Sequence, residues 1–273
     1  MYLLFDIGGS KTRLAVSKDK KNLSQVEIVP TPQDFKKGIK FLVDSGKRIT
    51  GGKKIKMVAG GIAGPLNKNK TKLANSPNLP QWANQPLFSL LKKEFKSPVF
   101  LENDAALAGL GEVYYGAGKG GKIVAYLTIS TGVGGARLVE GQIDQNYFGF
   151  EPGQQIINYD ALINFQTLEA NISGTGLFKK YKKPAAELSA KKIWEREAKL
   201  LAYGLNNITV LWSPEIIILG GSVMKKISLK EVRKYFKQTL KIFPGLPKIK
   251  RSKLGDLSGI YGALAILNTK NKR

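Results

Sequence analysis

The amino-acid sequence predicts an α/β protein made of two related halves, and three observations carry that prediction. Runs typical of strands alternate with helical patterns along the whole chain. The length of 273 residues is near the size at which one hydrophobic core divides into two. Residues 5–16 (FDIGGSKTRLAV) are also similar to residues 129–139 (ISTGVGGARLV), because a shift of 124 positions places Gly8 on Gly132.

The first half contains the signals of one complete sheet with its helices. Strands are expected at residues 2–5, 13–16, 26–29, 56–59 and 99–101, and helices at 35–43, at 87–95 and from Asp104 to near Gly116. The glycine-rich stretch GAGKGGK at 116–122 indicates a loop between domains. We therefore expect an N-terminal lobe at residues 1–115.

The second half repeats this plan. Strands are expected at residues 124–129, 135–139, 215–219 and 248–250, and helices at 185–210, 229–242 and 258–267. A C-terminal lobe is expected at residues 116–257, with the segment 258–273 packing back on the N-terminal lobe. Only the final TKNKR has the composition of a disordered tail.

Two residue types are missing from the chain, and their absence excludes whole classes of chemistry. There is no cysteine, which excludes disulfides, thiolate nucleophiles and cysteine-based zinc sites. There is no histidine, which excludes a Ser-His-Asp triad and any imidazole base. A side-chain base acting near neutral pH is therefore expected to be a carboxylate.

The apolar runs and the first residues of the chain indicate where in the cell the protein is expected. No apolar run approaches the roughly 18 residues that a membrane span needs. The start, MYLLFDIGG, lacks the basic region and long apolar stretch of a signal peptide. We therefore expect a cytoplasmic protein with no membrane partner.

The formal net charge of +24 has two readings. Lysine pairs such as Lys36-Lys37 and Lys225-Lys226 either attract a partner rich in phosphate or form a solvated surface. The pairs are scattered and no nucleic-acid-binding motif contains them, so we do not expect nucleic acid as the main partner. The charge would still attract an anionic nucleotide.

Each of the two similar segments is expected to be a hairpin with a glycine turn, since glycine permits positive φ. Many such hairpins bind nothing. These two, however, carry polar side chains at the turn: Asp6, Ser10, Lys11 and Thr12 in the first, Ser130 and Thr131 in the second. Backbone N–H groups at such turns form anion-binding hollows, and two facing hollows would hold a polyphosphate between two domains. Neither turn matches the P-loop or the dinucleotide-binding fingerprint.

Three further positions have both a functional and a structural interpretation. Asp104 follows a strand and opens a helix, so it is either a general base or, with Asn103, a helix cap. Asp6 is either a carboxylate that orients Mg²⁺ or its waters, or a turn-forming residue. The glycine pair 220–221 either admits a flat adenine or is a plain strand-to-helix turn.

Six segments, in order over nearly the whole chain, are similar to the ROK family of sugar kinases. They are DIGGSKTRLAV, AGGIAGPLN at 59–67, NLPQW at 78–82, LENDAALAGLGE at 101–112, STGVGGA at 130–136 and IILGGS at 217–222. The resemblance implies the two-lobed actin-like ATPase (ribonuclease H-like) fold, with nucleotide and sugar in the cleft between the lobes. The two glycine turns would then be equivalent parts of two lobes that grip one ATP.

The resemblance also implies a role for each matching residue. Asp104 matches the catalytic base. Asp6 lies where members of the superfamily place an Asp near Mg²⁺, in contact with the ion or with one of its waters. The phosphate-binding set is Gly8, Gly9, Ser10, Lys11, Thr12, Ser130, Thr131 and Gly132, and the adenosine-binding pair is Gly220 and Gly221. The sugar-binding set is Asn78, Asn103, Asp104, Glu151, Gln154 and Glu169. Carboxylates can accept hydrogen bonds from two adjacent hydroxyl groups of a sugar. Lys11 and Glu169 have the alternative of facing solvent.

The chain departs from the family at its zinc site. The family pattern Glu-x-Gly-His, followed by cysteines, is here Glu151-Pro152-Gly153-Gln154 with no cysteine after it. Glutamine donates and accepts hydrogen bonds, so sugar contact can survive at position 154. The loop 155–167 carries the apolar residues Ile156, Ile157, Leu162, Ile163 and Phe165. We expect no zinc, and hydrophobic packing in place of the metal.

The sequence thus predicts an ATP-dependent hexose kinase that transfers the γ-phosphate to a hydroxyl, O6 of glucose or of a related hexose. A catalytically weak, sugar-sensing regulator that acts through a protein partner is the alternative, and a nucleic-acid binder is a third class. A homodimer is expected, although the residues themselves do not decide between dimer and monomer.

Overall fold

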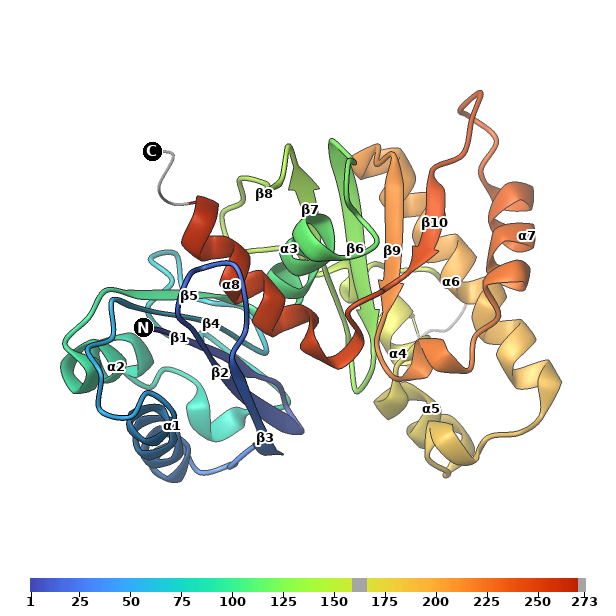
Figure 1. Cartoon of the computed structure of the whole chain (residues 1–273). Coiled ribbons are helices and arrows are strands. Elements are labelled where there is room, and N and C mark those ends of the chain that lie inside the picture. Colours follow the sequence, from blue (N-terminus) through green and yellow to red (C-terminus); the bar gives the residue numbers. More distant parts are fainter. Residues whose placement is uncertain (159–165, 270–273) are drawn as a thin grey trace. The chain divides into compact units, whose positions relative to one another are not determined.

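A computed structural model of the chain describes residues 1–158 and 166–269 (Figure 1). Contacts divide the chain into two compact units. Unit 1 comprises Met1–Tyr115, Gln145–Gly149 and Leu257–Arg273, and unit 2 comprises Gly116–Asp144 and Phe150–Asp256. Each unit has one five-stranded sheet and its own hydrophobic core. Of the expected disordered tail TKNKR, all but Thr269 lies outside the described residues.

Unit 1 forms the elements that its apolar periodicity predicts. Its strands are β1 (Tyr2–Ile7), β2 (Lys11–Ser17), β3 (Gln25–Pro30), β4 (Met57–Ile62) and β5 (Val99–Asn103). Its helices are α1 (Phe35–Ile49), α2 (Leu87–Phe95), α3 (Asp104–Tyr115) and α8 (Ser258–Thr269), with a 3₁₀ turn, η1, at Pro80–Trp82. Helix α1 runs six residues past its expected end at Val43, because Gly46 and Ile49 continue its buried face.

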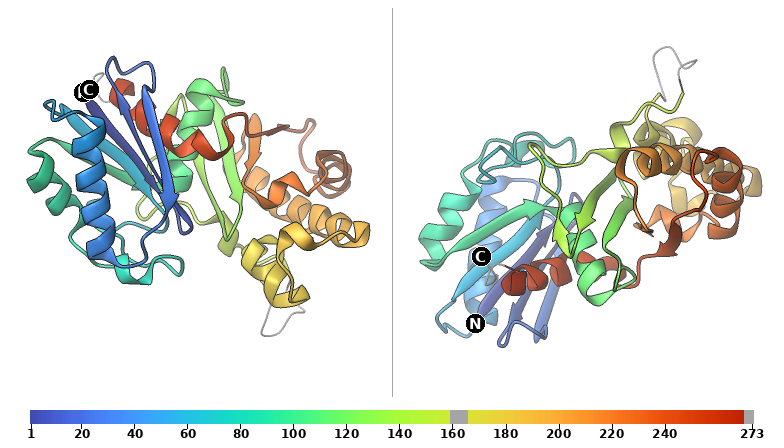
Figure 2. Two further views of the ribbon diagram at one scale, coloured as in Figure 1. Left: turned by 60° about the horizontal axis from the view of Figure 1, so that its bottom comes forward. Right: turned by 90° about the horizontal axis from the view of Figure 1, so that it is seen from above.

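The sheet of unit 1 is covered on both faces, as the two views of Figure 2 show for α1 (blue) and α8 (red). Successive side chains of a strand point to opposite faces. Leu3 and Phe5 of β1 therefore join the core cluster that contains residues of α1 and α2. Asp6, on the other face, contacts Gly259 of α8.

Helices α3 and α8 cross at backbone contact. A side-chain carbon at Gly262 would collide with the carbonyl of Leu107, and one at Gly111 would collide with the carbonyl of Ser258. Only glycine permits such an approach. The first turn of α8 and the whole of α3 are thereby held in one arrangement within unit 1.

Unit 2 contains the strands β6 (Ile123–Ile129), β7 (Val133–Val139), β8 (Gln142–Ile143), β9 (Ile216–Gly220) and β10 (Lys248–Arg251). Its helices are α4 (Leu168–Ile172), α5 (Gly174–Tyr181), α6 (Lys191–Trp212) and α7 (Leu229–Thr239). Short 3₁₀ turns are η2 (Pro152–Gln154), η3 (Ala185–Glu187) and η4 (Val223–Lys225), and η5 (Gly255–Leu257) spans the junction with unit 1.

Two helix boundaries in unit 2 differ from the expected ones. The pattern from Ala185 does not form one helix, because η3 ends at Glu187 and α6 starts only at Lys191. The indole N–H of Trp194 donates to the carbonyl of Leu188, which holds this break in place. Helix α7 ends at Thr239 rather than at residue 242, since Leu240 is already extended and a Pro-Gly turn follows.

The two sheets have the same strand order. Unit 1 reads β3-β2-β1-β4-β5 and unit 2 reads β8-β7-β6-β9-β10. In each sheet the first two pairings are antiparallel and the last two are parallel. The duplication expected from the two glycine turns is therefore present in the topology, and the α/β class is confirmed.

The shift of 124 positions, however, does not align the two turns. In unit 1, residues 8–11 lie between the last paired residues of the hairpin, Ile7 and Thr12. In unit 2, residues 130–132 lie between the corresponding pair, Ile129 and Val133. Gly8 is thus the first residue of its turn, and Gly132 is the last residue of its own. Counted from these last pairs, the first strands correspond at a shift of 122 and the second strands at a shift of 121, so Thr128 is the counterpart of Asp6.

Within residues 1–158 and 166–269, no helix has both the length and the apolar character that crossing a membrane requires.

The helix crossing leads to a stability prediction. Replacing Gly262 by alanine is expected to lower the free energy of unfolding by about 1–3 kcal/mol, because α8 must move away from the backbone of α3. Urea unfolding followed by circular dichroism measures this. Gly245→Ala is the matched control, since a carbon there meets nothing within 4 Å. Equal stability of the two variants would contradict the close crossing.

Candidate functional site

The candidate residues of unit 1 gather at one edge of its sheet. Strands β1, β4 and β5 are parallel, and near their carboxyl ends Asp6 pairs with Gly61 and Ile62 pairs with Asn103. The turn after β1 and Asp104, the first residue of α3, therefore share this edge. In open α/β sheets, ligands bind outside the carboxyl ends of the strands.

The turn between β1 and β2 is braced by two threonines. The N–H of Gly8 donates to the carbonyl of Lys11 at 3.0 Å, and the hydroxyl of Thr31 donates to the carbonyl of Gly8 at 2.6 Å. Thr12, expected to reach phosphate, is 1% exposed, and its hydroxyl donates to Thr31. In this structure Thr12 supports the turn from inside.

The outer part of the same turn offers two backbone donors. Within the described part of the chain, no partner is recorded for the N–H groups of Gly9 and Ser10. The side-chain amide of Gln33 donates to the carbonyl of Gly9 at 3.1 Å and so helps to orient that peptide. The side chain of Lys11 is exposed, which agrees with the alternative that it faces solvent. Adjacent unengaged N–H groups are what an anion-binding hollow needs.

Asp6 lies behind the turn rather than at its tip. Its buried carboxylate forms an ion pair with Nη1 of Arg13 at 3.0 Å. It also rests on the start of α8, where a side-chain carbon on Gly259 would lie 2.6 Å from the Asp6 Cγ. Arg13 belongs to the repeated segment 5–16, and its place in the sequence indicated no functional role. The hairpin register, in which Arg13 is the cross-strand partner of Asp6, is the signal that would have found the pair.

Asn103 and Asp104 both take part in starting α3. The Asn103 side chain accepts from the N–H of Ala106 at 3.0 Å and donates to the carbonyl of Gly64 at 3.1 Å. The Asp104 Oδ1 accepts from the N–H of Ala105 at 2.8 Å. The capping alternative therefore holds for both residues. It does not exclude a base, because a carboxylate at a helix N-terminus stays ionised and has several lone pairs.

Glu102 is a buried carboxylate next to this pair that sequence reasoning missed. Its Oε1 accepts from the N–H of Asn103 at 3.0 Å, and its Oε2 forms an ion pair with Lys70. Lys70 belongs to a turn that is closed by the side chain of Asn67. Strand parity puts Glu102 inside the protein, but no spacing in the sequence linked it to a lysine 32 positions away.

Asn78 joins the NLPQW loop to the first glycine turn. A side-chain carbon on Gly9 would lie 2.8 Å from the Cβ of Asn78, so the turn and the loop are in direct contact. The loop is anchored by Trp82, which is buried beside Gly38 and donates its indole N–H to the carbonyl of Pro32 at 3.0 Å. The exposed Asn78 is therefore supported by a buried anchor.

The second glycine turn is closed differently from the first. The N–H of Ser130 donates to the carbonyl of Gly132 at 2.9 Å. The first N–H groups of α5, those of Gly174 and Thr175, donate to the carbonyls of Ser130 and Thr131. For the N–H groups of Thr131 and Gly132, the described residues record no partner. Like the first turn, it has two adjacent backbone donors.

Gly220 and Gly221 follow β9 beside this turn. Gly220 pairs with Thr128 across the parallel strands. Gly221 has a φ of +94°, and a side-chain carbon there would collide with the carbonyl of Ile129. Conformation and close approach both require glycine at position 221. This explains the glycine structurally and leaves the adenine contact a prediction.

Three of the expected sugar-binding residues, Glu151, Gln154 and Glu169, lie together in unit 2. The Glu169 Oε1 accepts from Nε2 of Gln154 at 3.0 Å, and its Oε2 accepts from the N–H of Val133 at 2.7 Å. A side-chain carbon on Gly132 would lie 2.6 Å from the same Oε2. Glu169 therefore links the sugar-binding set to the second glycine turn instead of facing solvent.

Glu151 has a perturbed carboxyl group. Desolvation, and after it the repulsion from Glu169, raises the pKa of Glu151 above its ordinary value. Carboxylates accept hydrogen bonds from the hydroxyl groups of a neutral ligand. A perturbed pKa also occurs often at functional sites.

The loop expected to replace the zinc site by apolar packing is described only at its two arms. The N–H groups of Ile157 and Asn158 donate to the carbonyl of Gln166 at 2.9 and 3.2 Å. Ile157 packs against the core of unit 2, whereas Ile156 is exposed. The other apolar residues of that prediction, Leu162, Ile163 and Phe165, lie outside the described residues.

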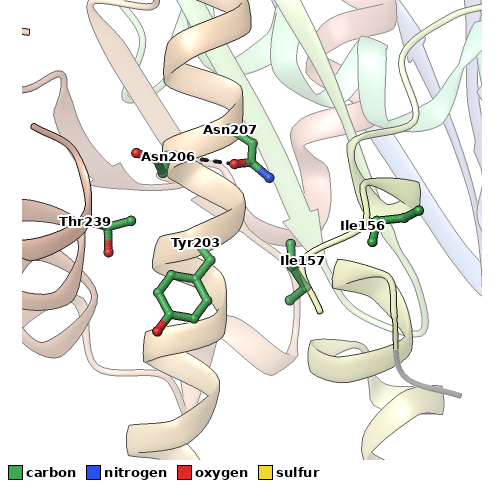
Figure 3. Close-up of a pocket in the computed structure, with 6 residues that line it drawn as sticks. All are labelled: Ile156, Ile157, Tyr203, Asn206, Asn207 and Thr239. Carbon is green, nitrogen blue, oxygen red and sulfur yellow. Dashed lines mark hydrogen bonds between the residues drawn. The ribbon is translucent and has the colours of Figure 1, made fainter. Parts of the chain in front are cut away.

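A pocket of about 220 Å³ lies elsewhere in unit 2 (Figure 3). It is lined by Ile156, Ile157, Tyr203, Asn206, Asn207 and Thr239. Among the residues that the structure describes, this lining includes none of the candidate site residues and neither a carboxylate nor a lysine.

Comparison with known proteins places this geometry in a family. The model of the ROK family matches residues 2–270. The chain belongs to the ROK family. The N-acetyl-D-glucosamine kinase of Mannheimia succiniciproducens is 29% identical to it, over 97% of this chain and 99% of that protein. The glucokinase of Thermotoga maritima is 28% identical, over 97% and 96%.

A solved structure agrees with this assignment. A ROK family glucokinase from Streptomyces griseus, in complex with glucose and AMPPNP, superposes with a TM-score of 0.82. The identity is 23%, over 97% of this chain and 98% of that chain. The family and the actin-like ATPase fold that the six segments implied are therefore confirmed for this ROK protein. The roles of the individual site residues stay predictions.

The electrostatic repulsion between Glu151 and Glu169 can be tested by titration. Replacing Glu169 by glutamine is expected to lower the pKa of Glu151, because a repelling negative charge is removed. The pKa should stay above the ordinary glutamate value, since desolvation, the larger cause, remains. Carbon-detected NMR of glutamate-labelled protein measures the shift, with Glu187→Gln as the control at an exposed position. An unchanged Glu151 pKa would show that the carboxylates do not interact.

Proposed function

We propose that this ROK protein is an ATP-dependent hexose kinase, in which Asp104 accepts the proton of the attacking hydroxyl. The observation that carries the proposal is the position of Asp104, at the start of α3 and at the carboxyl edge of three parallel strands. The names of its two relatives, a glucokinase and an N-acetyl-D-glucosamine kinase, support a sugar as the acceptor.

The two glycine turns supply the phosphate contacts in this proposal. The donors are the N–H groups of Gly9 and Ser10 in unit 1, and those of Thr131 and Gly132 in unit 2. Lys11, exposed beside the first pair, adds positive charge. The protein then acts mainly by alignment and by neutralising the charge of the transferred group.

A magnesium ion is the implied cofactor, and the residues present fit it. Mg²⁺ prefers oxygen ligands and keeps several of its waters. Asp6 supplies a buried carboxylate at the base of the first turn, and its pairing with Arg13 favours contact through water. The bound ion would offset charge on the phosphates. In this proposal Arg13 holds the Asp6 carboxylate in place.

The sugar contacts are assigned to residues of both units. In unit 2, Gln154 donates to Glu169, and Glu151 is close enough to Glu169 for the charge of Glu169 to raise its pKa. In unit 1, Asn78 is exposed beside the first turn, whereas both groups of the Asn103 side chain are already hydrogen-bonded within the protein. We therefore assign Asn103 to positioning Asp104, and propose O6 of glucose or a related hexose as the acceptor.

The proposal predicts the effect of one isosteric substitution. Asp104→Asn is expected to lower kcat at least about 100-fold, because the general base is lost while the cap of α3 is retained. Phosphotransfer from Mg·ATP is measured across glucose, fructose, mannose and the N-acetylhexosamines. Asp44→Asn is the matched control, since that residue forms only an exposed pair with Lys40 on α1.

Calorimetry of ATP binding and thermal unfolding show whether the Asp104→Asn variant stays folded and competent to bind nucleotide. Undiminished turnover would remove Asp104 from its role. Sugar binding by the unmodified protein without any phosphotransfer would instead support the sugar-sensing alternative. A homodimer stays a prediction that sedimentation can test.

A further inference from the structure

The loop between α7 and β10 exposes an apolar tip. Every residue of Lys241–Leu246 (KIFPGL) is exposed, and Ile242, Phe243 and Leu246 are 74%, 39% and 44% accessible. Figure 1 shows the loop extending past the ends of β10 and α7. Three large apolar side chains on one short loop are an unusual use of surface in a chain with so many charges.

The loop is anchored at both ends, so its tip is held outward. Leu240 before it and Ile249 after it are buried in the core of unit 2. Pro244 and Pro247 restrict the backbone between these anchors. The N–H of Lys248 donates to the carbonyl of Glu215 at 2.8 Å, which fixes the returning strand. The exposed tip is therefore a feature of the folded unit and not a frayed terminus.

The surroundings of the tip are positively charged. Between Glu231 and Asp256 there is no acidic residue, and this stretch contains Arg233, Lys234, Lys237, Lys241, Lys248, Lys250, Arg251 and Lys253. Some of these cations are engaged, since Arg233, Lys250 and Arg251 donate to backbone carbonyls, and the exposed Lys241 donates to the carbonyl of Lys237 at 3.3 Å. Lys237, Lys241 and Lys248 flank the tip with exposed side chains. The acids at this edge are Glu215 and Glu140, and Glu215 accepts from the N–H of Ile123.

The loop lies at the end of the sheet opposite to the candidate residues of unit 2. Strand β10 is parallel to β9, with Lys248 paired to Ile216. Gly220 and Gly221, like the turn 130–132, follow the other ends of their strands. Occupation of the loop would leave those residues accessible.

We propose that this loop docks unit 2 on the surface of an anionic lipid bilayer. Ile242, Phe243 and Leu246 enter the boundary between headgroups and acyl chains, and Lys237, Lys241 and Lys248 bind the anionic headgroups. An apolar face flanked by lysines has the chemistry of an interfacial membrane contact. Nucleic acid is the less suitable occupant, because phosphates would engage the lysines but would leave the apolar tip in water.

This inference revises the expectation that the protein has no membrane partner. That expectation rested on the absence of a long apolar run, which is the signal of a spanning helix. A docking loop needs only a few apolar residues at an exposed turn. The expectation therefore addressed a different kind of membrane contact.

Vesicle co-sedimentation of the full chain tests the proposal. Binding is expected to vesicles of equal parts phosphatidylcholine and phosphatidylglycerol, to weaken as salt is raised, and to be absent with phosphatidylcholine alone. The emission of the variant Phe243→Trp should shift to the blue when anionic vesicles are added. The unmodified protein, measured in the same way, should show a smaller shift. Absence of sedimentation with anionic vesicles, or equal binding to both kinds, overturns the proposal.

Two triple variants separate charge from insertion. Changing Lys237, Lys241 and Lys248 to glutamine, or Ile242, Phe243 and Leu246 to serine, should each weaken vesicle binding at least about tenfold. The matched controls are Lys36, Lys37 and Lys53 to glutamine, and Val26 and Ile28 to serine, all exposed on unit 1. If the serine variant binds as the unmodified protein does, the loop only adsorbs by charge and the insertion is wrong.

Enzyme activity separates this proposal from the proposed function. The loop variants should retain the phosphotransfer rate of the unmodified protein in vesicle-free solution and its circular dichroism spectrum. Loss of vesicle binding with retained activity supports the docking loop. If a variant loses both vesicle binding and the circular dichroism spectrum of the folded protein, its loss of binding reflects unfolding. The emission of the Phe243→Trp variant then decides, and the proposal is overturned if that emission does not shift when anionic vesicles are added.

Discussion

The backbone contact between α3 and α8 is the constraint on which the candidate site of unit 1 depends. Two residues that the proposed chemistry needs are attached to these helices. Asp104 is the first residue of α3, and the carboxylate of Asp6 rests on Gly259 in the first turn of α8. Because the glycines Gly111 and Gly262 let the helices touch, the start of α3 and the start of α8 keep fixed positions beside the sheet edge. The ion pair with Arg13 then orients the Asp6 carboxylate, and the N–H of Ala105 orients that of Asp104.

Most polar side chains among the candidate residues form hydrogen bonds that hold a turn or a helix start in place. Thr12 and Thr31 brace a carbonyl of the first turn. Asn103 caps α3 and ties it to the loop after β4. In unit 2, Glu169 stabilises the second turn through Val133. The groups left for a ligand are chiefly backbone N–H groups, which are already oriented before anything binds.

Much of this fold follows from apolar periodicity and glycine placement. All the strands except β8, and the helix 87–95, follow from the sequence because strong alternation or a helical stripe marks them. The two-residue strand β8 and the short helices α4 and α5 carry no such pattern and were not predicted. The predictions were wrong where local chemistry competes with the pattern. Helix α6 starts late because a turn held by Trp194 interrupts the helical stretch. The shift of 124 positions fails because strand register is not visible in a match of residue types.

The candidate site could be predicted in its residues but not in their connections. Asp6 and Asp104 follow from a motif, whereas their partners depend on tertiary contact. The pairs Arg13 with Asp6 and Lys70 with Glu102 join residues whose proximity only a register or a folded turn reveals. The burial of Thr12 depends in the same way on a distant residue, Thr31, whose hydroxyl accepts its hydrogen bond.

The anchor of the NLPQW loop also gives the protein an optical label. The chain has three tryptophans, and Trp82 is the one that belongs to unit 1, while Trp194 and Trp212 belong to unit 2. Trp82 is buried with its indole N–H bonded, so its fluorescence differs from that of an indole in water. With Trp194 and Trp212 replaced by phenylalanine, emission spectroscopy would follow the melting of one half of the molecule without an attached dye.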